Sequence, residues 1–408
     1  MTHSSITGNI QMTLPVNEPA RGYAPGSPEA LRLAKEIGRV AGRVAELPHV
    51  INGERHLVGK PSPVTAPHDH AHVLGHYSPA TADQVDAAIR ASLAARPGWS
   101  RTPWWDRATI LLRAAELVAG KYRDELLATT MLGQSKTFHQ AEIDAACELA
   151  DFFRYNAAYA AQIYASQPTS VPGEFNYLDQ RGLEGFVLAI TPFNFTAIGG
   201  NLPTTPALMG NTVVWKPSEK AALSSDVIMR VLEEAGLPPG VINLVHGDGK
   251  DIATRALASE HLAGFSFTGS TAVFRQLWKT TAENLDRYRS YPRIVGETGG
   301  KNAVVVHPSA DLDAVRVALV RGAFEHQGQK CSAASRAYIP RSMWKTLEDQ
   351  LAGTVGDLVV GDPTQHDTFV GAVIDEASLR RLESAIRAGT RRHGHHFRPE
   401  RDRPRLRW

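Results

Sequence analysis

The chain has 408 residues, enough for two or three domains, and its 43% hydrophobic and 21% charged residues are typical of a soluble globular protein. This balance excludes disordered, collagen-like and disulfide-stapled chains, and no apolar run approaches the roughly 20 residues that a membrane span needs. The formal net charge is +2, but the last eighteen residues hold seven Arg and only two acids, so the rest is mildly acidic. This distribution gives no argument for nucleic-acid binding.

The N-terminal sequence MTHSSITGNIQMTLPVNEP lacks the charged and apolar segments of a secretion signal and the Arg-rich character of a transit peptide. It therefore predicts a cytoplasmic location. Cys147 and Cys331 lie far apart, with neither a disulfide framework nor zinc-ligand spacing. We expect free thiols in a reducing compartment and no metal site.

The first part of the chain is predicted to be mainly helical. After an irregular lead-in, an amphipathic stretch predicts a helix over 28–46. Apolar residues at every third and fourth position predict helices through most of 81–165, beginning with a Thr-x-Asp cap. Pro and Gly then break the pattern, and the alternation within 166–182 predicts a strand or hairpin.

The middle of the chain changes to short β-rich runs, each followed by a helical stretch, which predicts parallel βαβ units. These runs lie at 185–190, 212–216, 241–245 and 263–267. A second series begins after Glu297, with strands at 302–306 and 335–340 on either side of a helix over 311–327. The sequence therefore predicts an α/β fold built in two successive units.

Cys331 lies between a predicted helix and a predicted strand, after Lys330 and before several small residues. A cation lowers the pKa of a nearby thiol, and the thiolate is the reactive form. A buried structural cysteine is the alternative, and we interpret Cys147, on an apolar helix face, in that way.

Two polar residues follow predicted strands. Glu297 ends a β-type run before two glycines, where a carboxylate can act as a general base or can simply be solvated. Asn194 follows a strand and a proline. Its amide suits an oxyanion, but an N-cap of the next helix explains it equally well.

Nucleotide-binding signals are present but individually weak. The segment Gly247–Ile252 has only two glycines of a dinucleotide fingerprint. In Phe267–Thr271 a strand turns through glycine into a helix start, whose N–H groups suit a pyrophosphate. Lys216 ends a predicted strand, where open α/β sheets bind ligands. An ordinary loop is as good an explanation for each of them.

The motifs TPFNF, WKPSE, FTGS, ETGGKN and GQKCS occur in that order, and together they resemble the aldehyde dehydrogenase superfamily. The resemblance runs from about Ile51 to about Ala388. Within it, FNFTAIGGNLPTTPALMGN, LWKTTAENLDRYRSYPRIVGETGGKN and GQKCSAASRAYIP are similar to the Δ1-pyrroline-5-carboxylate dehydrogenase family. The implied fold is a Rossmann-type NAD-binding domain plus a second α/β catalytic domain, which is incomplete here.

The resemblance implies NAD-dependent oxidation of L-glutamate γ-semialdehyde to L-glutamate in proline degradation. Cys331 would be the nucleophile that forms a thiohemiacetal and then a thioester. Asn194 and the Cys331 N–H would hold the oxyanion, and Glu297 would activate water. The pocket for the charged substrate would be lined by Glu148, Phe195, Lys330 and Ser332.

The resemblance also implies cofactor contacts and partners. Lys216 and Glu219 would contact the adenosine ribose, which favours NAD over NADP, and Thr191 would contact the pyrophosphate through its backbone and side chain. The turn beneath the phosphates would consist of Gly269, Ser270, Thr271, Ala272 and Val273. A homo-oligomer, dimer or higher, and a functional contact with proline dehydrogenase are implied, with neither nucleic acid nor membrane as a partner.

The implied domain organisation has five parts. They are a lead-in (1–50), the NAD-binding domain (51–165 and 183–296), an oligomerisation hairpin (166–182), a partial catalytic domain (297–390) and an aberrant Arg-rich tail (391–408). Because the family pattern fades after about Gly389, where a shifted reading frame would explain the change, we expect an unstable chain with little activity. Two alternatives are a non-catalytic NAD-binding remnant and another subfamily, such as a succinate-semialdehyde or CoA-acylating enzyme. The residues around Phe195 and Lys330 argue against the latter.

Overall fold

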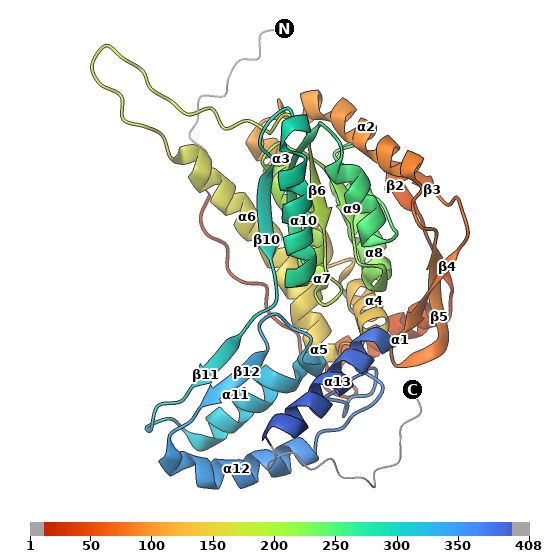
Figure 1. The fold of residues 1–408 in the computed structure, drawn as a ribbon, viewed down its shortest axis with the longest axis vertical. Coiled ribbons are helices and arrows are strands. Elements are labelled where there is room, and N and C mark those ends of the chain that lie inside the picture. Colours follow the sequence, from red (N-terminus) through yellow and green to blue (C-terminus); the bar gives the residue numbers. More distant parts are fainter. Residues whose placement is uncertain (1–11, 394–408) are drawn as a thin grey trace.

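The computed structural model describes residues 12–393, and its centre is a seven-stranded sheet with the order β10-β9-β6-β7-β8-β2-β3 (Figure 1). Its strands are β2 (His49–Ile51), β3 (Glu54–His56), β6 (Phe186–Ile190), β7 (Thr212–Lys216), β8 (Ile242–Leu244), β9 (Leu262–Thr268) and β10 (Arg293–Glu297). Strands β6 to β10 are parallel, and only the β2–β3 hairpin is antiparallel to its neighbours. The predicted parallel units are therefore confirmed.

Helices cover both faces of this sheet, which explains why β6 and β7 are fully buried and why β6 and the centre of β7 are apolar. Val187 and Trp215 pack into a core with helices on one face, while Leu188 and Val214 pack into a second core on the other. The crossover helices are α7 (Thr196–Leu208), α8 (Ala222–Ala235), α9 (Gly249–Leu257) and α10 (Thr271–Glu283). Successive side chains of a strand thus pack into the cores on opposite faces of the sheet.

The helical region predicted for 81–165 is confirmed, and Thr81 makes the expected cap, a reciprocal capping box with Gln84. Its helices are α2 (Ala82–Trp99), α3 (Trp104–Ala119), α4 (Arg123–Gln134), α5 (Phe138–Ala141) and α6 (Glu148–Ala165). A π-helical segment, η1 (Glu142–Cys147), joins α5 to α6. Such π-helical turns are rare in proteins, and those that do occur are frequently found at functional sites.

The N-terminal region differs from the prediction. Helix α1 (Pro28–Ala41) ends at Gly42, well before residue 46. The chain then enters a three-stranded sheet that the sequence did not predict, made of β1 (Ala45–Leu47), β4 (Ser62–Ala66) and β5 (Asp69–Tyr77). The charged and His-rich composition of β5 conceals its strand character, because three of its first residues face solvent.

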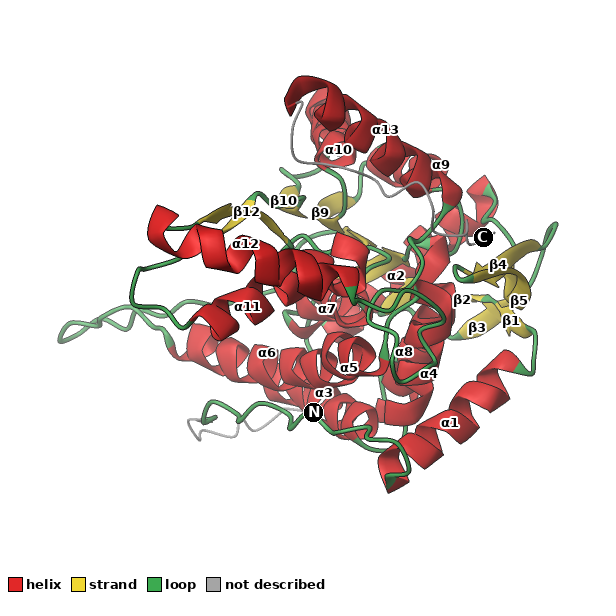
Figure 2. Cartoon of the chain, turned by 90° about the horizontal axis from the view of Figure 1, so that it is seen from below, coloured by secondary structure: helices red, strands yellow, loops and turns green. Residues whose placement is uncertain are grey.

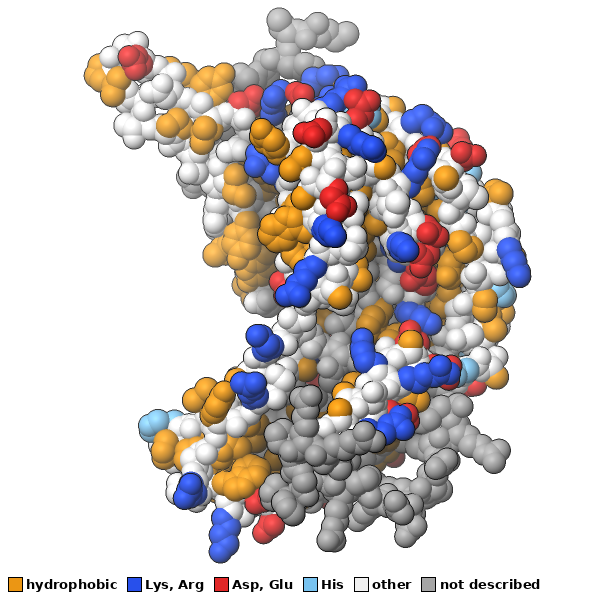
Figure 3. All heavy atoms as spheres, viewed as in Figure 1, with side chains coloured by type: hydrophobic (Ala, Val, Ile, Leu, Met, Phe, Trp, Pro, Cys, Tyr) orange, Lys and Arg blue, Asp and Glu red, His pale blue; other side chains and the backbone are white. Residues whose placement is uncertain are grey.

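Residues 166–182 form a projecting arm that contains no strand, so the predicted strand is absent from the described structure (Figure 1). The arm nevertheless folds back on itself, since the Gln167 side chain bonds both backbone groups of Leu178. An isolated two-stranded hairpin is marginally stable in water. Apolar side chains are exposed on the arm (Figure 3), and Val171, Phe175 and Tyr177 are among them.

A second lobe follows β10 and contains a parallel two-stranded sheet of β11 (Asn302–Val305) and β12 (Ala334–Tyr338). Its helices are α11 (Leu312–Phe324), α12 (Arg341–Gly356) and α13 (Glu376–His393). Helices α11 and α12 lie side by side (Figure 2) and share a small core with β11. The predicted strands and helix are confirmed, although α11 ends three residues early.

The implied domain boundaries remain predictions. Residues 391–393 of the expected tail belong to α13, and the remainder lies outside the described residues. Among the helices of residues 12–393, none combines the length and apolar character needed to cross a bilayer.

Candidate active site

Four predicted site residues meet at one edge of the seven-stranded sheet. Thr191 follows β6, Lys216 ends β7, Gly269 follows β9 and Glu297 ends β10. The registers pair Ile190 with Lys216 and Glu297 with Thr268, so these carboxyl ends are level. Ligands of open α/β sheets bind at this edge.

The residues expected at the ribose form an ion pair, with 2.8 Å between Lys216 Nζ and Glu219 Oε1. Thr191 differs from the prediction in one respect. Its backbone N–H donates to the Lys216 carbonyl and is not available to a ligand. Its hydroxyl accepts from Trp215 Nε1 at 3.0 Å and still has a proton to donate.

The predicted phosphate turn has the expected form. Gly269 leads into α10, whose N-cap Ser270 accepts from the Val273 N–H, and the following residues are exposed. A Cβ on Gly269 would lie 2.7 Å from the Phe267 ring, so only glycine fits here. The exposed helix start offers N–H donors and the positive end of a dipole.

Cys331 occupies a turn before β12 and is partly exposed. Asn194 Nδ2 donates to the Gln329 carbonyl at 2.7 Å, and Asn302 Nδ2 donates to the Cys331 carbonyl at 2.5 Å. A Cβ on Gly300 would lie 1.9 Å from that carbonyl oxygen. The structure therefore brings Asn194 and the glycine turn after Glu297 to the Cys331 loop.

Asn194 does not cap α7, because the N-cap is Phe195 and it makes no side-chain cap bond. The Glu297 carboxylate is exposed and makes no hydrogen bond or ion pair within residues 12–393. Its segment approaches the Cys331 loop through Gly300. An exposed, unpaired carboxylate remains free to activate water.

The chain before Cys331 adopts an unusual backbone. His326 and Gln327 have φ of 49° and 58°, in the left-handed region that non-glycine residues rarely adopt, and α11 therefore ends earlier than predicted. The Gln327 side chain holds this turn by donating to the Ala372 carbonyl at 2.6 Å and accepting from the Gly371 N–H. Strain of this kind persists where the surroundings enforce it.

Three of the four predicted substrate residues lie together. Lys330 Nζ is 5.6 Å from the centroid of the Phe195 ring, and the Oε2 atom of Glu148 is buried without a hydrogen-bond partner. Burial, with the nearby Asp144, raises the pKa of Glu148 to about 7. Ser332 is exposed and makes no side-chain hydrogen bond within residues 12–393.

Two further residues belong to this cluster and were missed from the sequence. Asp144 forms ion pairs with both Lys136 and Lys330, the latter at 3.0 Å. Lys136 Nζ also lies 4.3 Å from the Phe195 ring centroid. The available signal was charge within an otherwise apolar helical segment, since side chains such as these are rarely buried without a partner.

The pKa of Glu148 makes stability pH-dependent. Because its pKa is about 7 when folded and 4.5 in the reference state, the folded protein binds more protons between these values. The free energy of unfolding therefore falls as pH rises from about 4.5 to 7, by up to about 3 kcal/mol from this group. Glu148→Gln should be more stable than wild type at pH 8 by that amount, and the difference should vanish near pH 4.5.

Denaturant unfolding across this pH range checks the prediction, with Glu184→Gln as control because the Glu184 side chain is 63% exposed. A stability difference that does not vary with pH would contradict it.

Cys147 is buried as predicted, but it lies against an ion pair and not in a purely apolar setting. Its Sγ is 3.3 Å from the Arg123 guanidinium and 3.6 Å from Glu142. Burial, with Glu142, raises the pKa of Cys147 to about 12, so this thiol is unreactive.

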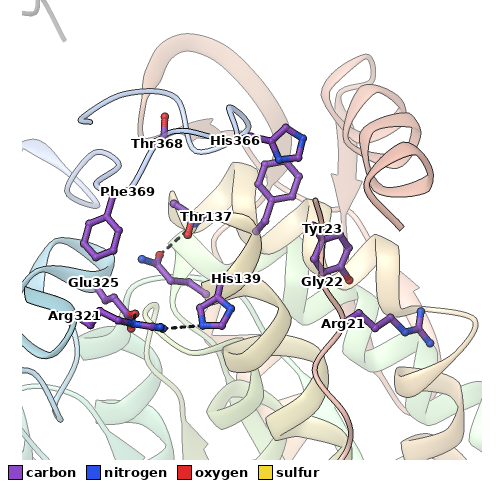
Figure 4. A pocket seen from close by; sticks show the side chains of 12 residues that line it. Arg21, Gly22, Tyr23, Thr137, His139, Arg321, Glu325, His366, Thr368 and Phe369 are labelled. Atoms are coloured by element: carbon purple, nitrogen blue, oxygen red, sulfur yellow. Dashed lines mark hydrogen bonds and ion pairs between the residues drawn. The ribbon is translucent and has the colours of Figure 1, made fainter. Parts of the chain in front are cut away.

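A separate cavity of about 330 Å³ contains none of the predicted site residues (Figure 4). There Arg321 contacts His139 at 2.7 Å, and His366 stacks on Phe138. Among the described residues, no group of three or more His, Cys, Asp or Glu could hold a metal ion.

Comparison with known proteins identifies the family. The model of the Aldehyde dehydrogenase family matches residues 56–400. The chain belongs to the aldehyde dehydrogenase family. Its resemblance to Δ1-pyrroline-5-carboxylate dehydrogenases is confirmed by the mitochondrial enzyme of that name from Bos taurus, which is 48% identical over 367 residues. This match covers 90% of the chain and 65% of the relative.

Solved structures confirm the aldehyde dehydrogenase fold. The Mycobacterium tuberculosis Δ-pyrroline-5-carboxylate dehydrogenase bound with NAD has a TM-score of 0.91 and 51% identity, covering 94% of this chain and 72% of that one. Proline utilization A from Bdellovibrio bacteriovorus has a TM-score of 0.87 and 28% identity, and the match covers 93% of this chain and 39% of that one.

The comparisons contradict the predicted cytoplasmic location, because the relatives from Bos taurus, Mus musculus and Homo sapiens are named mitochondrial. The cytoplasmic prediction rested only on the lack of secretion-signal and transit-peptide features in the first nineteen residues. This aldehyde dehydrogenase spans 65% of the length of the Bos taurus relative.

Proposed function

We propose that this aldehyde dehydrogenase oxidises L-glutamate γ-semialdehyde to L-glutamate with NAD, as a step of proline degradation. The observation that carries the proposal is the charged cluster around Lys330, the residue that precedes Cys331. Lys330 lies near the ring of Phe195, and the Glu148 carboxyl group lies close enough to Lys330 to interact with its charge. A cation and a carboxylate suit the carboxylate and ammonium of an amino-acid aldehyde.

The sheet edge fits NAD. The Lys216–Glu219 pair can receive ribose hydroxyls, and the exposed start of α10 after Gly269 can receive the pyrophosphate. When bound there, the nicotinamide would accept a hydride from the substrate carbon. The names of the relatives and the NAD-bound structure from Mycobacterium tuberculosis support this assignment.

Cys331 performs the covalent step. Its thiolate attacks the aldehyde carbon to give a thiohemiacetal, and the Asn194 amide with the Cys331 N–H stabilises the oxyanion. For this, the Asn194 amide exchanges its bond to the Gln329 carbonyl for one to the substrate oxygen.

Glu297 completes the reaction as the general base. Loss of hydride from the thiohemiacetal leaves a thioester on Cys331, and the exposed Glu297 carboxylate removes a proton from the attacking water. Hydrolysis releases glutamate and the free thiol. Ser332 follows the nucleophile in the sequence and is the fourth residue that we propose to contact the substrate.

Turnover of glutamate γ-semialdehyde, supplied as Δ1-pyrroline-5-carboxylate with NAD, tests the function. NADH production supports it. NAD binding without turnover would favour the non-catalytic remnant, and preference for succinate semialdehyde or a requirement for CoA would favour another subfamily.

The cofactor preference is expected to depend on Glu219, whose carboxylate would repel the 2′-phosphate of NADP. Glu219→Gln should narrow the ratio of kcat/KM for NAD over NADP by about tenfold, because a repulsion of about 1–2 kcal/mol is removed and Lys216 loses its partner. Steady-state kinetics with both cofactors measures this. Equal use of both cofactors by the wild type would refute the assignment.

We further propose a homo-oligomer that uses the 166–182 arm, and a functional contact with proline dehydrogenase. The exposed Phe175 and Tyr177 support the first, and the similarity to a proline utilization A protein supports the second. Sedimentation of the chain with and without the arm tests the oligomer.

A further inference from the structure

Lys330, which precedes Cys331 and lies near Phe195, contacts a layer of buried charged side chains that have no part in the proposed reaction. Asp144 projects from the π-helical segment η1 and is almost fully buried. Its Oδ2 atom binds the ammonium of Lys136, which is completely buried, and lies 3.0 Å from that of Lys330. One carboxylate oxygen thus joins two lysines.

The charges of this layer do not cancel. Two ammonium groups face the single carboxylate of Asp144, which leaves one positive charge unbalanced at this contact. Buried ions are costly unless they are paired, so the excess charge favours an incoming anion. Lys330 is the outer of the two lysines, because its side chain is 15% exposed while Lys136 is inaccessible.

Lys330 has a competing partner. Glu325 lies 3.5 Å from its ammonium, but this carboxylate is paired with Arg321 at 2.6 Å. Asp144 is nearer and carries no arginine partner, so it decides where the Lys330 ammonium rests. In that position the ammonium lies 5.6 Å from the ring centroid of Phe195.

We propose that Asp144 is a positioning residue: backed by Lys136, it holds the Lys330 ammonium at Phe195 and beside Cys331, where it receives the substrate carboxylate. This inference rests on the proposed oxidation of an amino-acid aldehyde. Without Asp144, Lys330 turns toward Glu325 and the carboxylate loses its partner.

Asp144→Asn separates positioning from simple electrostatics. The substitution keeps the shape of the side chain but makes the pocket more positive, so a purely electrostatic role predicts a lower KM for an anionic substrate. Positioning predicts the opposite. The KM for glutamate γ-semialdehyde should rise about tenfold, since a charge-assisted hydrogen bond is lost, with kcat changed less than about threefold.

Propanal, which has no carboxylate, distinguishes positioning from a general loss of structure. Its kinetics should be unchanged in Asp144→Asn. The matched control is Asp86→Asn, which removes the exposed partner of Arg255 and should leave both substrates unaffected. An unchanged or lower KM for glutamate γ-semialdehyde, or an equal loss with both aldehydes, would overturn the proposal.

A measurement without turnover keeps the inference testable if the proposed oxidation fails. Iodoacetate and iodoacetamide alkylate the same thiolate, so their rate ratio at Cys331 reports attraction of a carboxylate and not the thiolate fraction. Cys147 contributes little because it is buried and its pKa is raised to about 12.

The Lys330→Met variant lacks the ammonium and therefore gives the iodoacetate-to-iodoacetamide rate ratio that is expected without it. We expect the iodoacetate-to-iodoacetamide ratio of Asp144→Asn to fall at least about threefold, toward that of Lys330→Met. A ratio equal to or above the wild-type value would overturn the proposal. Absence of turnover in the wild type, with the expected change in ratio, would refute the oxidation of glutamate γ-semialdehyde and leave the position of Lys330 established.

Discussion

Cys331→Ala should abolish NADH production from glutamate γ-semialdehyde, by at least about 10³-fold, while NAD affinity changes little. The thiol is the only proposed nucleophile, and alanine cannot form the thiohemiacetal. The proposed cofactor residues, such as Lys216 and Gly269, lie at the edge of the seven-stranded sheet and are not altered. Steady-state assays and NAD titration by fluorescence measure the two quantities separately.

Cys147→Ala is the matched control, because it removes the other cysteine from a buried position beside Arg123. This variant should keep most of the wild-type activity. Normal turnover by Cys331→Ala would show that the thiol is not the nucleophile and would refute the mechanism.

Arg123→Met should lower the free energy of unfolding by about 3–5 kcal/mol, the usual cost of removing one partner of a buried ion pair. Arg123 and Glu142 are both inaccessible to solvent, and their ion pair joins α4 to η1. Arg123 also binds Glu18 at 2.7 Å, which attaches the N-terminal segment to the same pair. Among the described residues, the variant leaves Glu142 buried with the Tyr23 hydroxyl, the Arg21 N–H and the Cys147 thiol as donors.

Arg255→Met provides the comparison, since the Arg255 side chain is 52% exposed and pairs with Asp86 at the surface. Its loss should cost far less stability than the loss of Arg123, because an exposed ion pair contributes little. Urea unfolding of both variants at neutral pH measures the difference. Similar costs at the two sites would mean that Glu142 is adequately satisfied without Arg123.

The sequence predicted the seven-stranded sheet well where strands are buried on both faces. The runs 186–190 and 213–215 are continuously apolar, and each is followed by a helix. It failed for β5, whose first three residues face solvent and whose charged and His-rich composition conceals the strand. It also failed for 166–182, because alternation specifies a strand only where another strand is available to pair with it.

The candidate site was predictable to the extent that it follows local motifs. Cys331, Asn194 and Glu297 each lie in a short segment with a characteristic sequence, and the structure brings their segments together. Asp144 and Lys136 could not be found in this way. Their role depends on contact with Lys330, almost two hundred residues later in the chain, across a π-helical turn that no simple periodicity predicts.

The contact between Asn194 and the loop of Cys331 has a consequence for biosynthesis. The strands of the nucleotide edge and the Asp144 layer all precede Cys331, so a chain emerging from the ribosome presents them first. The Cys331 thiol is therefore synthesised after the residues that surround it. Its loop is fixed when the Asn194 amide donates its hydrogen bond to the Gln329 carbonyl. The Cys331 thiol remains partly exposed after this contact has formed, whereas Cys147 is buried.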